Sequence, residues 1–209
     1  MQDNFYTRFY IKFGKRWFDF VASLMALIVL SPVFIIISIL IKLMDEGPIF
    51  YQQKRMGQDF KPFLLIKFRT MTVDADKIGP LVTSGDDKRI TKIGKFLRKT
   101  KLDELPQLFN VIKGDMSIVG PRPEVEKYVK AYEGDYKDIL KVKPGITDYA
   151  TVVYSREEEI LKNFENPEEG YIREILPKKI ELYKKYIAEM GFKTDLKIII
   201  DTIIKIIKP

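Results

Sequence analysis

The sequence predicts a mostly α-helical protein with a small β element, an α/β-type monotopic membrane protein held by one N-terminal helix. Three observations lead to this fold class. Residues 18–41 form an apolar stretch, and about 20 apolar residues rising about 1.5 Å each cross the hydrocarbon core of a bilayer. Several later segments place apolar residues at helical spacing, and only a few short segments resemble strands. We expect a membrane segment in residues 1–43 and one globular domain in residues 44–209.

Ser31 and Pro32 interrupt the apolar stretch near its midpoint. Pro32 has no amide hydrogen and its ring clashes with the carbonyl of Ile28, while the Ser31 hydroxyl can bond the freed carbonyl of Leu27. The membrane helix is therefore expected to be broken or bent at Ser31-Pro32. Basic residues flank the stretch on both sides, namely Arg8, Lys12, Lys15 and Arg16 before it and Lys42, Lys54 and Arg55 after it.

These basic flanks indicate the topology, because Lys and Arg next to membrane segments prefer the cytoplasmic side. A straight span would place one basic cluster outside, whereas a re-entrant helix keeps both inside, so re-entry is favoured over spanning. A buried core helix fits this length less well. A secretory signal peptide is disfavoured, because no small-residue cleavage site follows the apolar run.

Composition limits the chemistry of the chain. It has a net charge of +7, a pI near 9.3, no cysteine and no histidine. Thiol nucleophiles, thiolate metal sites, serine–histidine triads and histidine-rich zinc sites are thereby excluded. The positive charge predicts an anionic partner, and the apolar anchor favours lipid headgroups and small phosphates over nucleic acid. The basic residues also match no nucleic-acid recognition element.

After the membrane segment, the sequence predicts a hairpin, a loop and a basic helix. A turn at residues 45–48 precedes a strand at 49–53, and a turn at 55–58 precedes a strand at 63–69. Residues 71–89 are polar and contain Gly79-Pro80 and Gly85-Asp86-Asp87, typical of a surface loop. Residues 90–101 form an amphipathic basic helix, which would cover either a membrane surface or a protein core.

The remaining elements are mostly helical. A helix is expected from near Asp103 to Lys113-Gly114, with Pro106 in its first turn. Residues 124–140 have mixed helical spacing, 143–147 form a turn, and 148–154 have strand character. Residues 171–189 form a charged helix interrupted at Pro177. Residues 196–207 form a last amphipathic helix, for which the membrane surface and the protein core are equally open alternatives.

Asp103 and Glu104 are the first candidate site residues. Unsatisfied amide hydrogens at a helix start stabilise anions by roughly 0.3 to 1 kcal/mol, which would keep these carboxylates ionised, but acidic residues there are usually only caps. The surrounding cations strengthen the case. They are Lys67 and Arg69 at the end of a strand, Arg98 five residues before the pair, and Arg122, which Pro121 and Pro123 clamp in one direction. Arginines, a carboxylate and Mg²⁺ are the usual equipment for phosphoryl transfer.

An ordered set of motifs resembles the monotopic phosphoglycosyl transferases, the bacterial sugar transferases that begin glycoconjugate assembly on undecaprenyl phosphate. The blocks are Ser31-Pro32, Lys67-Phe68-Arg69-Thr70-Met71, Arg98 with Leu102-Asp103-Glu104-Leu105-Pro106-Gln107-Leu108-Phe109-Asn110, Lys113-Gly114-Asp115-Met116-Ser117, Gly120-Pro121-Arg122-Pro123 and Lys143-Pro144-Gly145-Ile146-Thr147. Each block alone is weak, whereas the ordered set is specific and covers most of the chain.

The resemblance implies a re-entrant helix broken at Ser31-Pro32, amphipathic interfacial helices and a catalytic domain on the cytoplasmic face of the bacterial inner membrane. It also implies a ping-pong reaction. Asp103 would attack the β-phosphate of a UDP-sugar and release UMP, and undecaprenyl phosphate would then take the sugar phosphate from the enzyme. Glu104 would hold Mg²⁺, and Lys67, Arg98 and Arg122 would bind phosphate oxygens.

Arg156 marks a departure from the family pattern. Many relatives continue Gly-Leu-Ala-Gln-Val-Asn-Gly-Arg after the Pro-Gly-Ile-Thr block, whereas this chain has Asp148-Tyr149-Ala150-Thr151-Val152-Val153-Tyr154-Ser155-Arg156. Arg156 is expected at the arginine position, as a substrate-binding residue. We also expect a minimal catalytic unit, without the extra membrane helices or appended domains of larger relatives.

Three alternatives stay open at this stage. A non-enzymatic anchored module would bind anionic lipid through its basic helices, and a metal-assisted direct transfer would need no covalent intermediate. A homodimer is compatible with the amphipathic faces, which could equally meet lipid. The identity of the sugar is beyond the reach of the sequence.

Overall fold

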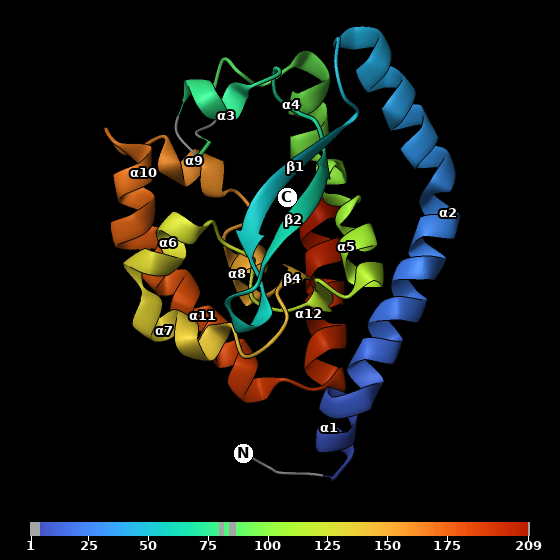
Figure 1. Ribbon diagram of the computed structural model, residues 1–209, viewed down its shortest axis with the longest axis vertical. Helices are drawn as coiled ribbons and strands as arrows, with labels where there is room; N and C mark the ends of the chain where they lie inside the picture. The colour runs from blue at the N-terminus through green and yellow to red at the C-terminus, as the bar shows by residue number, and fades with distance from the viewer. Residues whose placement is uncertain (1–4, 80–81, 84–86, 209) are drawn as a thin grey trace.

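The computed structural model describes residues 5–79, 82–83 and 87–208. One long N-terminal helical rod consists of α1 (Phe5–Phe9), a π-helical turn η1 (Tyr10–Gly14) and α2 (Lys15–Met44). This rod is long and apolar enough to cross a membrane by length and composition. It runs along one side of the molecule, bowed at mid-length (Figure 1).

Pro32 lies inside α2, which continues through it as one α-helix. The predicted break is therefore a bend and not an interruption. Ser31 Oγ donates to the carbonyl of Ile28 at 2.8 Å, which corrects the expected partner, the carbonyl of Leu27. The carbonyl of Ile28 is the one that the missing amide hydrogen of Pro32 leaves free, so the serine hydroxyl satisfies it and lets the helix continue.

One face of α2 contacts the rest of the protein along its length. The buried positions on this helix are Asp19, Ser23, Ile37 and Ile41, and Ile37 and Ile41 pack with Phe68, Ile93 and Leu97. The other faces are apolar and exposed, at positions that include Val21, Met25, Ile28, Val29, Ile35, Ile36 and Leu43. Helix α2 therefore contacts the rest of the protein through one face only.

The predicted hairpin is confirmed. Strands β1 (Phe50–Met56) and β2 (Pro62–Phe68) pair antiparallel, with Phe50 opposite Phe68 and Met56 opposite Pro62, and the short 3-10 turn η2 (Gln58–Phe60) joins them. In the predicted loop 71–89, the structure has helix α3 (Ala75–Ile78) and a bridge between Met71 and Ile90. Its residues 80–81 and 84–86, which include Pro80, Gly85 and Asp86, lie outside the described residues.

The basic amphipathic helix is confirmed as α4 (Lys92–Lys99). Its residues Ile93 and Leu97 are buried against α2 and β2, whereas Phe96 is exposed. A 3-10 turn η3 (Leu102–Glu104) follows, and then α5 (Gln107–Lys113), which ends at Gly114 in the left-handed conformation, φ 94°, as predicted. The protein core therefore takes most of the apolar face of α4.

Two parallel strands, β3 (Ser117–Val119) and β4 (Gly145–Thr147), were not predicted. Between them lie α6 (Glu126–Ala131) and α7 (Glu133–Ile139). The strand expected at residues 148–154 is wrong, because this segment forms α8 (Tyr149–Val153). Asp148 caps that helix by accepting from Thr151 N at 2.6 Å, and this local bond outweighs the strand preference of the β-branched and aromatic residues.

The C-terminal part is helical. It consists of α9 (Glu157–Leu161), α10 (Pro167–Gly170), the π-turn η4 (Tyr171–Ile175), α11 (Leu176–Glu189) and α12 (Phe192–Ile207). Pro177 stands in the first turn of α11, where its missing amide hydrogen costs nothing. In α12, Asp195 and Ile198 are buried, whereas Ile200, Ile203, Ile204 and Ile207 are exposed. Its first half therefore completes the core.

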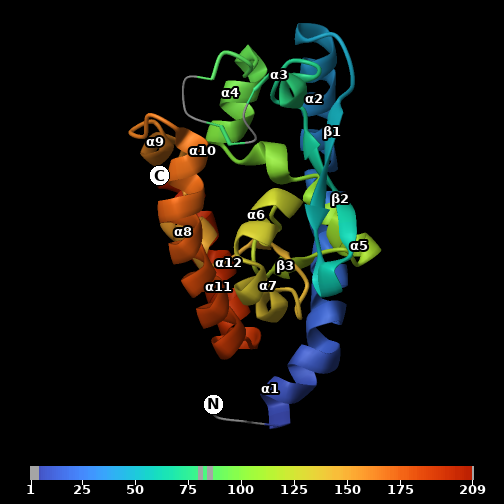
Figure 2. The ribbon, with the colours of Figure 1, turned by 60° about the vertical axis from the view of Figure 1, so that its left-hand side comes forward.

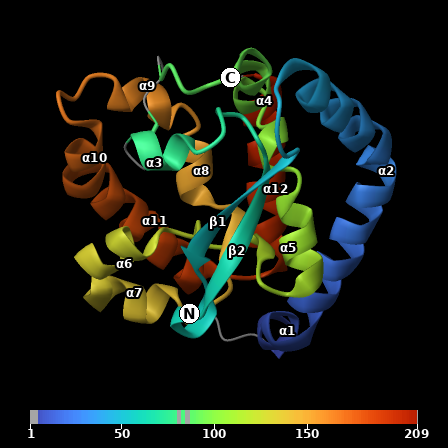
Figure 3. The ribbon, with the colours of Figure 1, turned by 45° about the horizontal axis from the view of Figure 1, so that its top comes forward.

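The elements form three layers. Figure 2 shows the hairpin and α2 on one side, α11 and α12 on the other, and α6, α7 and β3 between them. The largest apolar cluster joins α6, α7, η4 and α11 through Tyr128, Tyr136, Ile139, Ile175 and Tyr183. Figure 3 shows that α3, α4 and α9 gather at one end of the molecule, close to the end of the hairpin.

Candidate active site

Asp103 and Glu104 lie in η3, between α4 and α5. Lys101 precedes them in a left-handed conformation, φ 57°, which turns the chain sharply after α4. The expectation of a helix beginning near Asp103 is therefore wrong in detail, because α5 begins at Gln107 and the carboxylates occupy the turn before it. The turn presents both side chains to the interior between α4 and the hairpin.

Glu104 is bound by two of the predicted cations. Lys67 Nζ donates to Glu104 Oε1 at 2.9 Å, Arg122 Nη1 donates to Oε2 at 3.2 Å, and Arg122 Nη2 also donates to Oε1. Although burial opposes ionisation, Arg122 and Lys67 hold the pKa of Glu104 well below its usual range. Glu104 in turn raises the pKa of Arg122. The three groups thus form one cluster of ion pairs in which two cations share one carboxylate.

Asp103 is buried, with a relative exposure of 6%. Its Oδ1 is buried and has no hydrogen-bond partner. Burial raises the pKa of Asp103, and the nearby Lys67 lowers it in part. The expected helix-terminus effect does not dominate, because Asp103 precedes α5 and is desolvated. An under-solvated carboxylate beside cations has an oxygen available for a ligand or an electrophile.

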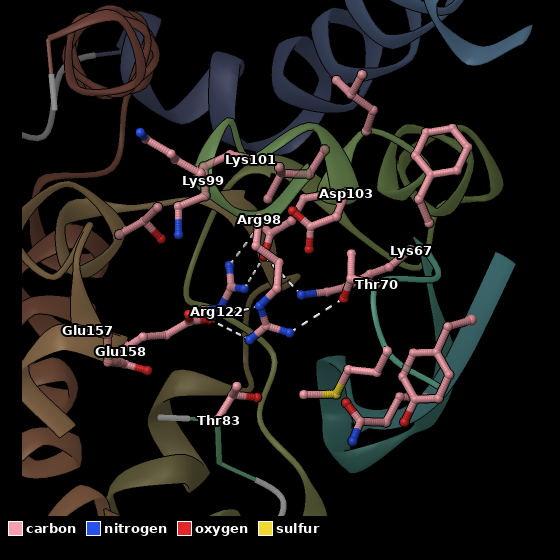
Figure 4. A pocket seen from close by; sticks show the side chains of 18 of the residues that line it. Lys67, Thr70, Thr83, Arg98, Lys99, Lys101, Asp103, Arg122, Glu157 and Glu158 are labelled. Carbon is pink, nitrogen blue, oxygen red and sulfur yellow. Dashed lines mark hydrogen bonds and ion pairs between the residues drawn. The ribbon is translucent and has the colours of Figure 1, made fainter. Parts of the chain in front are cut away.

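Arg98 projects from α4 towards the same centre. Its Nε donates to Glu158 Oε1 at 3.0 Å, its Nη2 pairs with the same oxygen, and its Nη1 lies 3.5 Å from Thr70 Oγ1. Gly94 lets α4 approach Thr70 closely, because a Cβ at this position would lie 2.0 Å from the carbonyl oxygen of Thr70. Figure 4 shows Arg98, Arg122 and Lys67 converging beside Asp103.

The backbone around Arg122 is fixed at three consecutive residues. Pro121 O accepts from Gly145 N at 2.9 Å, Arg122 N donates to Asp148 Oδ2 at 3.1 Å, and Pro123 O accepts from Arg55 Nη1 at 3.1 Å. Both prolines are buried. Arg122 is thus held in one orientation towards Glu104.

The structure places the other two predicted cations less centrally. Arg69 is buried, and its Nη1 and Nη2 donate to the carbonyls of Glu46 and Asp45 at 2.9 and 3.0 Å. It therefore holds the chain that leaves α2, and phosphate binding by Arg69 stays a prediction. Arg156 precedes α9, lines the cavity and lies 3.8 Å from Glu159. Its substrate-binding role also stays a prediction.

A cavity of about 1460 Å³ surrounds these groups. Its apolar lining residues come from α2, from η3 to α5, and from α12, namely Ala26, Leu30, Leu105, Leu108, Ile203 and Ile206. Its charged lining residues include Arg55, Glu124, Glu157 and Lys179. The cavity thus has a mixed apolar and charged lining around one reacting centre.

Several site residues were missed by sequence reasoning. Glu158 pairs with Arg98 across 60 residues. Glu124, Tyr171 and Lys179 form a buried network that lines the cavity, with Tyr171 Oη donating to Glu124 Oε1 at 2.6 Å. The run Glu157-Glu158-Glu159 was the only visible signal. Sequence spacing does not predict these ion pairs and hydrogen bonds, because the tertiary fold brings their partners together.

The described residues contain no group of three or more His, Cys, Asp or Glu side chains placed to hold a metal. Mg²⁺ keeps few protein ligands and is often bound by one or two carboxylates together with substrate phosphates. Asp103 Oδ1 has no partner, whereas both carboxylate oxygens of the adjacent Glu104 accept hydrogen bonds from Lys67 and Arg122. These carboxylates do not form a closed all-protein site, and a magnesium ion here would need substrate phosphates among its ligands.

Comparison with known proteins identifies the family. The family model described as bacterial sugar transferase matches residues 10–209. The chain belongs to the bacterial sugar transferases. This sugar transferase is 39% identical over 195 residues to the UDP-glucose:undecaprenyl-phosphate glucose-1-phosphate transferase of Klebsiella pneumoniae, covering 91% of this chain and 39% of that protein.

Two further relatives differ in how much of their length is matched. The uncharacterized sugar transferase EpsL of Bacillus subtilis is 38% identical over 193 residues, 92% of this chain and 87% of that protein. The UDP-N-acetylgalactosamine-undecaprenyl-phosphate N-acetylgalactosaminephosphotransferase of Aeromonas hydrophila is 40% identical over 147 residues, 68% of this chain and 34% of that protein. The match thus covers about two fifths or less of the length of the Klebsiella pneumoniae and Aeromonas hydrophila proteins.

Proposed function

We propose that this sugar transferase moves a sugar 1-phosphate from a UDP-sugar to undecaprenyl phosphate, giving an undecaprenyl diphosphate sugar and UMP. The names of several relatives describe transfers of this kind. The observation that carries the proposal is the buried carboxylate of Asp103, with an unpartnered oxygen, beside Lys67, Arg98 and Arg122. Cations in this number serve a substrate with several phosphate charges.

The transfer is proposed to occur in two displacements. A carboxylate oxygen of Asp103 forms a bond to the β-phosphorus, the bond from that phosphorus to the bridging oxygen breaks, and UMP leaves with the bridging oxygen and its electron pair. A phosphate oxygen of undecaprenyl phosphate then attacks the same phosphorus, and the bond to Asp103 breaks to restore the carboxylate. Both steps leave the protons and the net charge balanced.

The cations act on the charge that moves in these steps. Two anions must approach each other, and this repulsion is offset by Lys67, Arg98 and Arg122. The carboxylate of Asp103 needs no separate base once it is ionised. Because Asp103 is buried, few water molecules have to leave its carboxylate before it attacks the phosphorus. A magnesium ion held by Glu104 and the donor phosphates would supply additional neutralisation of phosphate charge.

The mixed lining of the cavity supports two different substrates. Its charged residues suit the water-soluble nucleotide sugar, and its apolar residues from α2, α5 and α12 suit a lipid chain. A site with both kinds of residue could lie at the membrane interface and reach both substrates. A cavity lined by charged residues alone would give no reason to expect a lipid acceptor.

We further propose that α2 is re-entrant and that the domain lies on the cytoplasmic face of the bacterial inner membrane. Both halves of α2 pack on the same domain, through Asp19 and Ser23 near one end and Ile37 and Ile41 near the other. A helix that crossed the bilayer upright would carry this domain into the hydrocarbon core. The bend at Pro32 and the basic residues on both flanks support the same topology.

The activity is tested by release of UMP from a panel of UDP-sugars in the presence of undecaprenyl phosphate. Asp103→Asn should abolish release while membrane association persists, and Asp138→Asn, at an exposed acidic residue of α7, serves as the control. Enzyme mixed with a UDP-sugar alone should gain the mass of a sugar phosphate at Asp103. Full turnover without this adduct would favour direct transfer, and unchanged release by Asp103→Asn would refute the proposed site.

The topology is tested by single cysteines, because the chain contains none of its own. Lys12→Cys and Glu46→Cys place one thiol beyond each end of the apolar helix, and Lys137→Cys marks the domain. A membrane-impermeant maleimide applied to spheroplasts should label none of the three until the membrane is opened. Labelling of only one helix end before lysis would establish a spanning helix instead.

A further inference from the structure

We propose that the first turns of α2 position the reacting groups of the enzyme. Lys15, Arg16 and Asp19, here called the α2 clamp, hold the C-terminal end of α5 and all three residues of β3. The other end of α5 follows Asp103-Glu104 in the chain, and β3 leads on to Arg122. The membrane helix is therefore an organising part of the active site as well as an anchor. The proposal rests on the proposed transfer reaction, because it assigns positioning residues to that reaction.

Arg16 holds the C-terminal end of α5. Its Nη1 donates to Val111 O at 2.5 Å, and its Nη2 donates to Ile112 O at 2.8 Å. The last carbonyls of a helix have no partner within the helix, so the guanidinium both satisfies them and complements the negative end of the helix dipole. Because α5 is only two turns long, fixing one end also fixes the other end, next to Glu104.

The neighbouring Asn110 extends this restraint to the hairpin. Asn110 Oδ1 accepts from Ile66 N at 3.0 Å, and Asn110 Nδ2 donates to Leu64 O at 2.7 Å. These bonds tie α5 to β2, which carries Lys67. Through α5, the guanidinium of Arg16 thereby fixes the positions of Asp103 and Glu104 relative to Lys67.

Asp19 and Lys15 hold β3. Asp19 is 3% exposed, and its carboxylate accepts from Ser117 Oγ at 2.7 Å and from Ile118 N at 3.1 Å. Lys15 Nζ donates to Val119 O at 2.9 Å. All three residues of β3 are thus bonded to one face of α2, because residues four apart lie above one another on a helix. Arg122 follows β3 by three residues, through the clamped segment at Pro121.

The last helix completes the arrangement. Lys15 Nζ also donates to Asp195 Oδ2 at 2.6 Å, Tyr10 Oη donates to the same oxygen at 2.7 Å, and Tyr186 Oη donates to Asp195 Oδ1 at 2.8 Å. Burying this many charged and polar groups costs free energy that apolar packing would avoid. Such a network fixes one arrangement of its parts, which is the property that a catalytic geometry requires.

The test compares Arg16→Ala with Lys12→Ala in the full-length enzyme in membranes. Lys12 lies on the same flank, is exposed, and contacts the ring of its neighbour Phe13. Lys12→Ala therefore removes one positive charge, as Arg16→Ala does, but leaves the contacts of α5 unchanged. Arg16→Ala should lower kcat for UMP release at least tenfold, because a misplacement of about 1 Å can cost about 100-fold. The KM for the UDP-sugar should stay within threefold, and Lys12→Ala should stay within twofold of wild type in kcat.

The kcat of Arg16→Lys and the membrane-bound fraction distinguish a role of Arg16 in positioning the reacting groups from a role in membrane anchoring. Arg16→Lys, which keeps the charge and reaches one carbonyl at a time, should recover part of the lost kcat, and the membrane-bound fraction should not change. If Arg16→Ala is not obtained folded, Arg16→Lys decides alone, with kcat expected at least threefold below wild type. Wild-type kcat in folded Arg16 variants, or an equal loss in Lys12→Ala, would overturn the proposal. An inactive wild type would instead refute the proposed function.

Discussion

Glu158 is expected to compete with the substrate for Arg98. Both hydrogen bonds from the Arg98 guanidinium to a carboxylate go to Glu158 Oε1, so a phosphate can use this face of Arg98 only after Glu158 has left it. The side chains are 21% and 37% exposed, and a partly exposed pair of this kind contributes about 0.2 to 1 kcal/mol. Glu158→Gln should therefore tighten binding of a diphosphate by up to about fivefold, since about 1.4 kcal/mol corresponds to tenfold.

The assay is calorimetric titration with UDP, which carries the diphosphate and cannot react. Glu169→Gln is the matched control, because it removes the same charge from an exposed ion pair with Arg173, and neither residue lines the cavity. The control should change the affinity by less than 1.5-fold if about 0.2 kcal/mol is the lower limit for such pairs. Weaker UDP binding by Glu158→Gln would refute the reasoning, since it would mean that Glu158 orients Arg98 for the substrate.

Three further predictions concern Asp103, magnesium and Asp148. Burial raises the pKa of Asp103, and only the ionised form reacts. In a pH–rate profile, the increase in kcat/KM should therefore occur at a higher pH than the pKa of an exposed aspartate. Lys67→Met should move this increase to a still higher pH, because Lys67 lowers the pKa of Asp103. EDTA should stop UMP release, Mg²⁺ should restore it, and Glu104→Gln should raise the Mg²⁺ concentration required; full turnover in EDTA would contradict the assignment. Asp148→Ala leaves the amides of Arg122 and Thr151 without their acceptor, so it should destabilise the protein by about 1 to 3 kcal/mol and lower kcat, whereas Asp148→Asn should do less in thermal unfolding and rate assays.

The sequence predicts those parts of this protein that local chemistry determines. The hairpin, the basic helix α4 and the glycine that ends α5 follow from periodicity and turn residues that act over a few positions. The motif blocks also place Lys67, Arg98, Glu104 and Arg122 in one centre, and the structure brings them together. These features could be predicted because each depends on neighbouring residues in the sequence or belongs to a recognisable motif.

The failures have a common physical origin in tertiary context. The strand expected at residues 148–154 is a helix because Asp148 caps it, and the side chain of Asp148 is held in place by Arg122 N, which lies 26 residues earlier in the chain. The guanidinium of Arg69 donates to the backbone carbonyls of Asp45 and Glu46, which lie 24 and 23 residues earlier in the chain, so spacing alone does not show this contact, and phosphate binding by Arg69 stays a prediction. Desolvation of Asp103 likewise depends on packing that no local pattern encodes.

The bond between Lys15 and Asp195 also has a consequence for the order of folding. The two residues are 180 positions apart, so the N-terminal helix emerges during synthesis long before its buried partner exists. Until α12 is made, Lys15 and Tyr10 must remain hydrated or lie among lipid headgroups, and contacts of such long sequence separation form late and slowly. The early membrane segment and the last helix therefore meet in a final step, and this step closes the domain around its own reaction centre.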